Sequence, residues 1–135
     1  MRIVFDTNVI LATFITHGAS AEVFEHCLTQ HQIISSAFIL EEVEDKLLKK
    51  FKFTANKVGD LIRFLRSETE TVDPIGLSRR VCRDTDDDKI LATTLAAHAD
   101  CILTGDNDLL DLKEYEGIFM LKVADFWKFE RSSKG

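Results

Sequence analysis

The sequence predicts an α/β fold: a single domain over residues 1–135, built as a three-layer α/β/α sandwich with a mostly parallel four- or five-stranded sheet. Short apolar segments rich in Ile, Val and Phe, typical of strands, alternate with longer segments of helical periodicity. Strands separated by helices pair in parallel through right-handed crossovers. The length of 135 residues fits one hydrophobic core.

Four apolar segments are expected to form strands. They are residues 2–6, "QIISS" at 32–36, "DCILTGD" at 100–106 and "IFMLKV" at 118–123. The first segment ends in Asp6 and the third in Asp106. Because open parallel sheets place their ligand sites at the carboxyl ends of the strands, we expect both carboxylates at the same edge of the sheet.

Helices are expected between these strands, at about 21–31, 37–48, 55–65 and 86–98. Each has apolar residues three or four positions apart, and Ser20, Ser36 and Thr54 stand at the first three N-cap positions. Two segments are expected to be irregular. Residues 69–78 contain the only proline and are predicted to form a loop, and residues 129–135 are predicted to be a frayed tail.

Cysteine and histidine patterns do not indicate a metal site. The three cysteines are far apart and odd in number, which argues against a disulfide framework or a CxxC zinc site. Cys27 and Cys101 are expected to be reduced core residues. The four histidines form no HExxH motif and are expected at the surface. No apolar run approaches the roughly 20 residues of a membrane helix, and the start lacks a signal peptide, so a soluble, cytoplasmic protein without membrane partners is expected.

The charge is unevenly distributed. The net charge is -6, yet residues 46–83 carry ten basic and four acidic residues. An acidic body with a basic middle can hold cations at one place and phosphates beside it. A solvated helix surface explains the same basic run equally well, so the charge pattern leaves both interpretations open.

An unusual group of acids precedes the last predicted helix. The segment "RDTDDDK", residues 83–89, contains four aspartates, more than capping and the helix dipole require. Asp88 also falls on the apolar stripe that continues with Leu91 and Leu95. A buried acid is costly unless it is paired or liganded, so Asp88 is the first candidate for a functional role and Asp87 the second.

A further set of acids lies on the predicted helix at 37–48. The segment "ILEEVEDK" supplies Glu41, Glu42 and Glu44. All three flank the apolar stripe of this helix, and periodicity does not choose among them.

The four acidic blocks, taken together, resemble the PIN domain family. They are "DTN" after the first strand, "ILEEV" on an early helix, "RDTDDDKIL" heading a later helix, and "TGDNDLL". The resemblance is strongest to the VapC-like ribonuclease toxins of toxin–antitoxin pairs, and it runs from about residue 2 to residue 127. One departure is "RDT" where that branch usually has Asp-Pro, which alters a loop and removes no acid.

The resemblance implies catalytic acids at five candidate positions, listed here in chain order: Asp6, Glu42, Asp87, Asp88 and Asp106. Asp87 and Asp88 are alternatives for the third acid. Counting back from the "TGD" strand favours Asp88, and the most similar branch of the family favours Asp87. Thr7, Asn8 and Thr104 match polar positions that support the carboxylates.

The expected chemistry is metal-dependent RNA cleavage. Clustered carboxylates repel one another, and their oxygen ligands suit Mg²⁺ or Mn²⁺, expected on Asp6, Asp88 and Asp106. A water activated by the metal then attacks the phosphodiester. Basic residues within 46–83 guide the RNA backbone. The resemblance also implies a cognate antitoxin and a homodimer.

Other functions remain open. One is a non-catalytic PIN-fold interaction module. Another is a phosphoryl-aspartate domain, against which Asn8 counts because such a site needs a second aspartate there. Phe51 and Phe53 lie in a lysine-rich stretch, and they either mark a surface over residues 46–66 that binds antitoxin or RNA, or fold into the core.

Overall fold

The central element of the protein is a six-stranded sheet in the order β3-β2-β1-β4-β6-β5. We describe it from a computed structural model, which covers residues 1–72 and 85–133. All pairs are parallel except β5 with β6. The strands are β1 (Arg2–Phe5), β2 (Gln32–Ser35), β3 (Glu70–Thr71), β4 (Cys101–Leu103), β5 (Glu114–Tyr115) and β6 (Ile118–Leu121).

The predicted α/β class and mostly parallel sheet are confirmed, and the difference lies in two short strands. β1, β2, β4 and β6 are the four predicted apolar strands, whereas β3 and β5 have two residues each. β3 falls within the predicted loop at 69–78, of which residues 73–78 lie outside the described part. Segments this short carry no periodic apolar signal, so the sequence did not reveal them.

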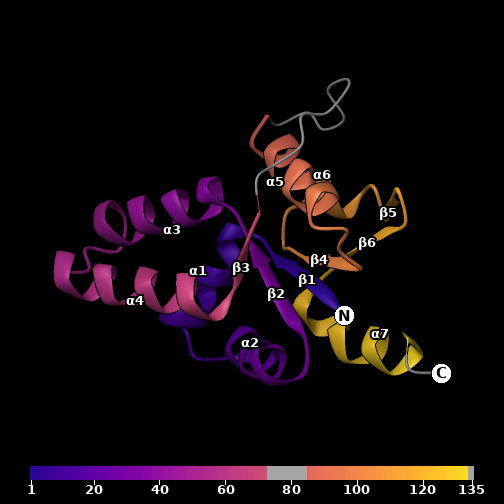
Figure 1. Ribbon diagram of the computed structural model, residues 1–135, viewed down its shortest axis with the longest axis horizontal. Helices are drawn as coiled ribbons and strands as arrows, with labels where there is room; N and C mark the ends of the chain where they lie inside the picture. The colour runs from indigo at the N-terminus through magenta and orange to yellow at the C-terminus, as the bar shows by residue number, and fades with distance from the viewer. Residues whose placement is uncertain (73–84, 134–135) are drawn as a thin grey trace.

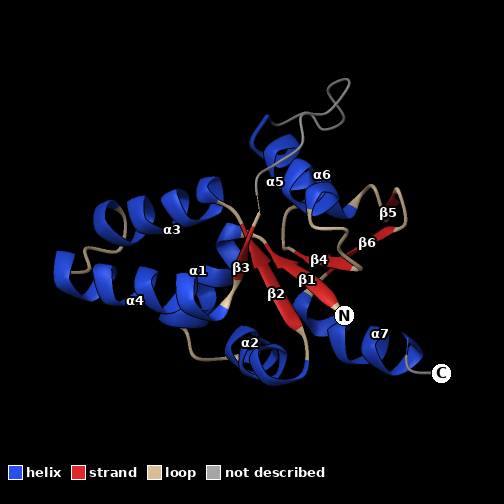
Figure 2. Ribbon diagram, viewed as in Figure 1, coloured by secondary structure: helices blue, strands red, loops and turns tan. Residues whose placement is uncertain are grey.

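Helices lie on both sides of this sheet (Figure 1). In this view α5 and α6 are above the sheet, α2 and α7 are below it, and α3 and α4 extend as a hairpin beyond β3 (Figure 2). The helices are α1 (Thr7–Ile15), α2 (Ala19–Gln30), α3 (Ala37–Lys49), α4 (Ala55–Glu68), α5 (Thr85–Ala96), α6 (Asn107–Leu110), the 3₁₀ turn η1 (Val123–Asp125) and α7 (Phe126–Ser133).

Two of the three predicted helix caps are present. The hydroxyl of Ser36 accepts a hydrogen bond from the amide of Ile39, and that of Thr54 accepts one from Lys57. These bonds satisfy amides that the first helical turn leaves without a partner. The prediction for Ser20 is wrong, because α2 begins at Ala19, one residue earlier in the chain than the predicted cap.

Helix α1 was not predicted at all. Its sequence is TNVILATFI, and the buried residues, on several sides of the helix, are Thr7, Val9, Ile10, Leu11 and Thr13. A helix that is apolar nearly all round has no polar face to produce the amphipathic period, so its pattern does not differ from that of a buried strand.

The prediction of a frayed tail over residues 129–135 is wrong for residues 129–133, which form the second half of α7. The aromatic ring of Phe126 is fully buried in the core and anchors the start of this helix. Glu130, only 6 % exposed, contacts two histidines on other elements. The polar end "RSS" looks frayed in sequence, but tertiary contacts hold it in place.

Cys27 and Cys101 are buried free thiols, as predicted. Burial is the main cause that raises the pKa of Cys27 to about 12, so this thiol stays protonated and unreactive. Cys82 lies outside the described part of the chain. Within the described residues, no helix has the length and apolar character needed to cross a bilayer.

Candidate active site at the carboxyl edge of the sheet

Asp6 directly follows β1 at the carboxyl edge of the sheet. Phe5 of β1 pairs with Leu103 of β4, so the two strands end at the same level. The amide of Asp6 donates to the carbonyl of Leu103 at 2.9 Å, and the hydroxyl of Thr104 donates to Oδ2 of Asp6 at 2.7 Å. Neighbouring strands therefore place the Asp6 carboxylate, only 7 % exposed, and hold it in one orientation.

Asp106 is connected to Asp6 by the same residue, Thr104. The amide of Asp106 donates to the hydroxyl oxygen of Thr104 at 3.0 Å, so this hydroxyl bridges the two acids. Oδ1 of Asp106 accepts from the amide of Asp108 at 2.8 Å and caps the short helix α6. The turn "TGDND" was equally open to a purely structural interpretation, and Asp106 does cap a turn while lying next to Asp6.

Glu42 reaches the same region from helix α3. The hydroxyl of Thr7, the first residue of α1, donates to Oε1 of Glu42 at 2.8 Å. Among the three glutamates that periodicity could not separate, Glu42 is half-buried while Glu41 and Glu44 are exposed. The structure thus brings Glu42 to the residue that follows Asp6.

The electrostatics of Asp6 show that these acids influence one another. Burial raises the pKa of Asp6 above its ordinary value. Hydrogen bonds from Thr104 and from the amide of Thr7 act in the opposite direction, and the negative charges of Asp106 and Glu42 raise the pKa further. Asp6 is consequently a buried carboxylate with two acidic neighbours, an arrangement that favours a bound cation.

Asp6, Glu42 and Asp106 offer only oxygen atoms as ligands. Within the described residues they do not form a compact group of three ligand atoms. Oxygen ligands suit Mg²⁺ or Mn²⁺, and Mg²⁺ keeps several of its waters, so it needs few ligands from the protein.

The predicted third acid lies on α5. Asp88, expected on the buried apolar stripe, is half-buried in the first turns of this helix. The hydroxyl of Thr93 donates to the hydroxyl oxygen of Ser36 at 3.1 Å, which fixes α5 against the end of β2. The side chain of Asp87 lies outside the described part of the structure, so the choice between Asp87 and Asp88 stays open.

Two shallow grooves meet at α1, next to the acids. One, of about 430 Å³, is lined by residues that include Asn8, Thr104 and Lys122. The other, of about 220 Å³, is lined by residues that include Asn8, Lys50 and Phe51. Asn8 and Ala12 line both, so the grooves form a track along α1 with Lys122 in one groove and Lys50 in the other. The acids do not line this track, which approaches Asp6 through Thr104.

Sequence reasoning missed the residues that connect elements far apart in the chain. Lys46 lies 3.4 Å from Oδ1 of Asn8, and the bond between Thr93 and Ser36 joins α5 to α3. No local sequence motif predicts either contact. Thr7, Asn8 and Thr104 were expected to support the carboxylates. Thr7 and Thr104 each donate to one of them, whereas Asn8 accepts from Lys46.

Replacing Thr104 by Val removes the hydroxyl that donates to Asp6. We expect the pKa of Asp6 to rise further and the free energy of unfolding at pH 7 to fall by about 1–3 kcal/mol, since hydrogen bonds to charged groups contribute about this much. Carboxyl ¹³C titration and chemical denaturation measure the two effects. Thr104→Ser keeps the hydroxyl and serves as the control, and equal pKa values for Asp6 in both variants would contradict the assigned role of Thr104.

One family model and several solved structures match this chain. None of the curated proteins matches the sequence significantly. The crystal structure of VapBC2 from Rickettsia felis, bound to a DNA fragment from its promoter, matches with a TM-score of 0.64 and 15% identity, over 90% of this chain and 98% of that chain. VapBC-1 from nontypeable Haemophilus influenzae matches with a TM-score of 0.64 and 13% identity, over 92% and 99%.

At sequence identities of 15% and 13%, the similarity to these two structures shows the fold alone. The family match comes from the sequence itself, because the model of the PIN domain matches residues 2–108, well over half of the chain. This range includes all five acids that the sequence analysis selected. The chain belongs to the PIN domain family.

Proposed function

We propose that this protein is a metal-dependent endoribonuclease that cleaves RNA phosphodiester bonds, and that it is the toxin of a toxin–antitoxin pair. The observation that carries the proposal is the buried Asp6 carboxylate, held by Thr104 and adjacent to Asp106 and Glu42 at the carboxyl edge of the sheet. Three carboxylates are gathered from β1, α3 and the end of β4, although their mutual repulsion opposes folding.

The donor set fits a hard divalent cation. Asp6, Asp106 and either Asp88 or Asp87 would hold Mg²⁺ or Mn²⁺ through oxygen atoms. When bound, such an ion makes water more acidic and offsets negative charge on the phosphoryl oxygens. Membership of the PIN family supports a divalent ion, and the choice between Mg²⁺ and Mn²⁺ is part of the proposal.

The protein's own residues orient this site. Thr104 fixes one oxygen of Asp6, and Thr7 fixes one oxygen of Glu42, so neither carboxylate has to be ordered when the substrate arrives. Glu42, half-buried on α3, is placed to accept a proton from the attacking water. No histidine or serine nucleophile is needed for this chemistry.

Basic side chains lie where an RNA backbone would pass. Lys50 and Lys122 border the two grooves beside α1, and Lys46 reaches Asn8 between them. Lysines contribute phosphate contacts that weaken as salt rises. We infer that single-stranded RNA follows this track past Asp6, in the cytoplasm, and that affinity falls with increasing ionic strength.

The proposed protein partners are based on the two similar solved structures. Both structures described above are VapBC proteins, and we propose a small antitoxin as a partner of this chain as well. A homodimer is part of the same proposal. The antitoxin would silence the enzyme by covering the groove lined by Asn8, Thr104 and Lys122, which lies beside the acids.

Metal binding should stabilise the fold. A ligand bound only by the folded state adds about 2.7 kcal/mol at 100 times its dissociation constant. We therefore expect saturating Mn²⁺ to raise the melting temperature, and to raise it less in Asp106→Asn and Asp88→Asn. Scanning calorimetry with and without Mn²⁺ measures this shift, and an unchanged melting temperature would count against the metal site.

The decisive test is RNA cleavage by the purified protein. We expect labelled single-stranded RNA to be cut in Mn²⁺ or Mg²⁺, and the cutting to stop in EDTA and in Asp106→Asn. Asp111→Asn is the matched control, since Asp111 is an exposed acid just after α6. If Asp106→Asn cleaves as fast as Asp111→Asn, the chain is a non-catalytic PIN-fold module and the activity comes from a contaminant.

A further inference from the structure

A second cluster of ligand-type side chains lies at the opposite edge of the sheet. Nε2 of His26 and Nε2 of His31 each lie 2.5 Å from the same oxygen, Oε2 of Glu130. His31 immediately precedes β2, so the cluster is at the amino ends of the strands, whereas Asp6 follows the carboxyl end of β1. This corrects the expectation that all the histidines are surface residues: the His31 side chain is only 7 % exposed.

The cluster joins two helices and lies against aromatic rings. His26 is on α2, His31 follows α2, and Glu130 is on α7. The ring of Trp127 lies 4.8 Å from that of His26, and the ring of Phe126 lies 6.0 Å from that of His31. The Glu130 side chain is 8 % exposed, and the apolar rings around it lower the local dielectric. A buried carboxylate in such surroundings is stable only when positive groups or hydrogen-bond donors lie close to it.

We propose that His26, His31 and Glu130 form a binding site for Zn²⁺. The three ligand atoms all lie within 4.8 Å of one another and so are already gathered at one place. Two imidazole nitrogens and one carboxylate oxygen are a donor set that suits zinc, unlike the oxygen-only acid pocket. Ligands around tetrahedral zinc are about 3.3 Å apart, so each histidine must move away from Glu130 by about 0.8 Å, and the two histidine nitrogens must move closer to one another.

Rotations of the histidine side chains would supply this movement. His26 is the most exposed of the three, at 28 %, and a water reaching the ion from its side completes the fourth position. Nδ1 of His31 lies 3.0 Å from the amino nitrogen of Met1. With Nε2 on the ion, the ring proton of His31 moves to Nδ1, and the Met1 ammonium must release one proton to the solvent before it can accept from Nδ1. Zinc binding therefore releases a proton and weakens at low pH.

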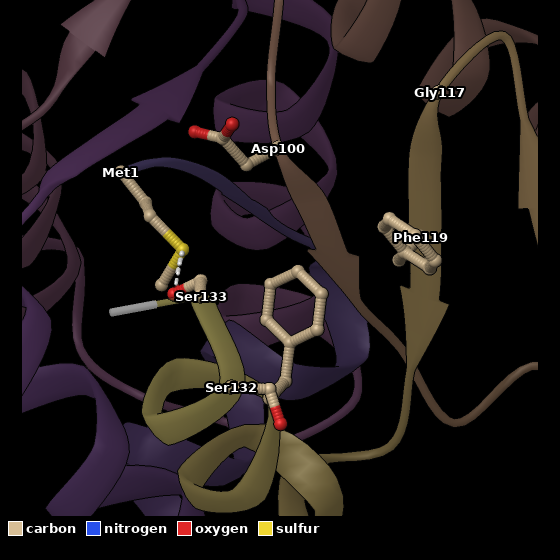
Figure 3. Close-up of a pocket in the computed structure, with 7 residues that line it drawn as sticks. Met1, Asp100, Gly117, Phe119, Ser132 and Ser133 are labelled. Carbon is tan, nitrogen blue, oxygen red and sulfur yellow. Dashed lines mark hydrogen bonds between the residues drawn. The ribbon is translucent and has the colours of Figure 1, made fainter. Parts of the chain in front are cut away.

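An ion at this place would fix the last helix to the sheet. The far side of α7 borders a hollow of about 450 Å³ between Met1, Asp100 and Phe119, with Ser132 and Ser133 at the end of the helix (Figure 3). The ion bridges α7 to α2 and to the start of β2. Zinc therefore sets the position of one wall of this hollow.

Trp127 gives a direct readout, because it is the only tryptophan and its ring contacts His26. The protein is purified without a polyhistidine tag and carries Asp6→Asn and Asp106→Asn, which disable the acid pocket. We expect Co²⁺, an open-shell ion, to quench Trp127 emission with 1:1 stoichiometry, and Zn²⁺ to displace it and restore the emission. His26→Gln should weaken this quenching at least 10-fold, whereas His17→Gln, at an exposed histidine, should not change it.

Gln at position 26 retains an N–H donor toward Glu130, so the variant should fold as wild type in chelator. A second measurement needs no variant at the site: Zn²⁺ at 100 times its dissociation constant should raise the melting temperature by roughly 8 °C. Absence of both the quenching and the thermal shift overturns the proposal. Quenching that is equal in His26→Gln also overturns it, because the ion would then be bound elsewhere.

Discussion

Asp6→Asn is expected to lower the rate of RNA cleavage by about 10²–10³-fold while leaving the protein folded. One electrostatic partner of a developing charge typically contributes this much to catalysis. Asn has nearly the same shape as Asp and can accept from the Thr104 hydroxyl, but it lacks the negative charge that holds a cation. Initial rates on one RNA, with Asp111→Asn as the control, measure the effect.

The same substitution should make the protein more stable at neutral pH. Burial and the charges of Asp106 and Glu42 raise the pKa of Asp6, so the folded state binds its proton more tightly than the unfolded chain does. The contribution of a protonated Asp6 to stability is complete below the unfolded pKa of about 3.9 and is lost as the pH rises through the folded value. At pH 7 the ionised Asp6 therefore destabilises the metal-free protein.

Melting curves in EDTA from pH 3.5 to pH 7 test this sign. We expect wild type and Asp6→Asn to coincide at the acidic end, and the variant to melt higher as the pH rises. A variant that melts below wild type at pH 7 would show that hydrogen bonds to Asp6 outweigh its burial. If Asp6→Asn cleaves RNA more slowly and also melts at a higher temperature, Asp6 serves function and lowers the stability of the fold.

The sequence predicted the place of the acids because strand endings are local features. Asp6 and Asp106 each follow a short apolar strand, and parallel pairing alone puts them at one edge. The structure shows β1 and β4 as neighbours and Thr104 between the two acids. Glu42 could not be selected by periodicity, because its distinction from Glu41 and Glu44 comes from contact with Thr7, 35 positions earlier in the chain.

What sequence reasoning missed depends on contacts between distant segments. His26 and His31 are separated from Glu130 by about a hundred residues, so no spacing motif links them. The same contact explains why α7 is a helix where a frayed end was expected. Helix α1 was missed for the opposite reason, since its surroundings are so apolar that no polar face marks its period.

Replacing both Phe51 and Phe53 by Ser is expected to lower the free energy of unfolding by about 3 kcal/mol. Both rings are half-buried and pack against the core, so each loses roughly half of the value of a fully buried phenylalanine. The amide of Phe53 donates to the carbonyl of Leu47 at 2.9 Å, which closes the turn between α3 and α4. The melting temperature should fall by roughly 9 °C.

This result would decide between the two roles that the sequence left open for the phenylalanines. Lys50 lies 5.5 Å from the ring of Phe51, and Lys57 lies 4.4 Å from that of Phe53, so lysines cover the rings toward solvent. Leu48→Ser is the matched control, because Leu48 is 37 % exposed on the same helix end and should change stability by less than about 0.5 kcal/mol. If the phenylalanine variant instead keeps its melting temperature but loses dimerisation or antitoxin binding, the rings belong to an interface and Leu48 becomes the next residue to test.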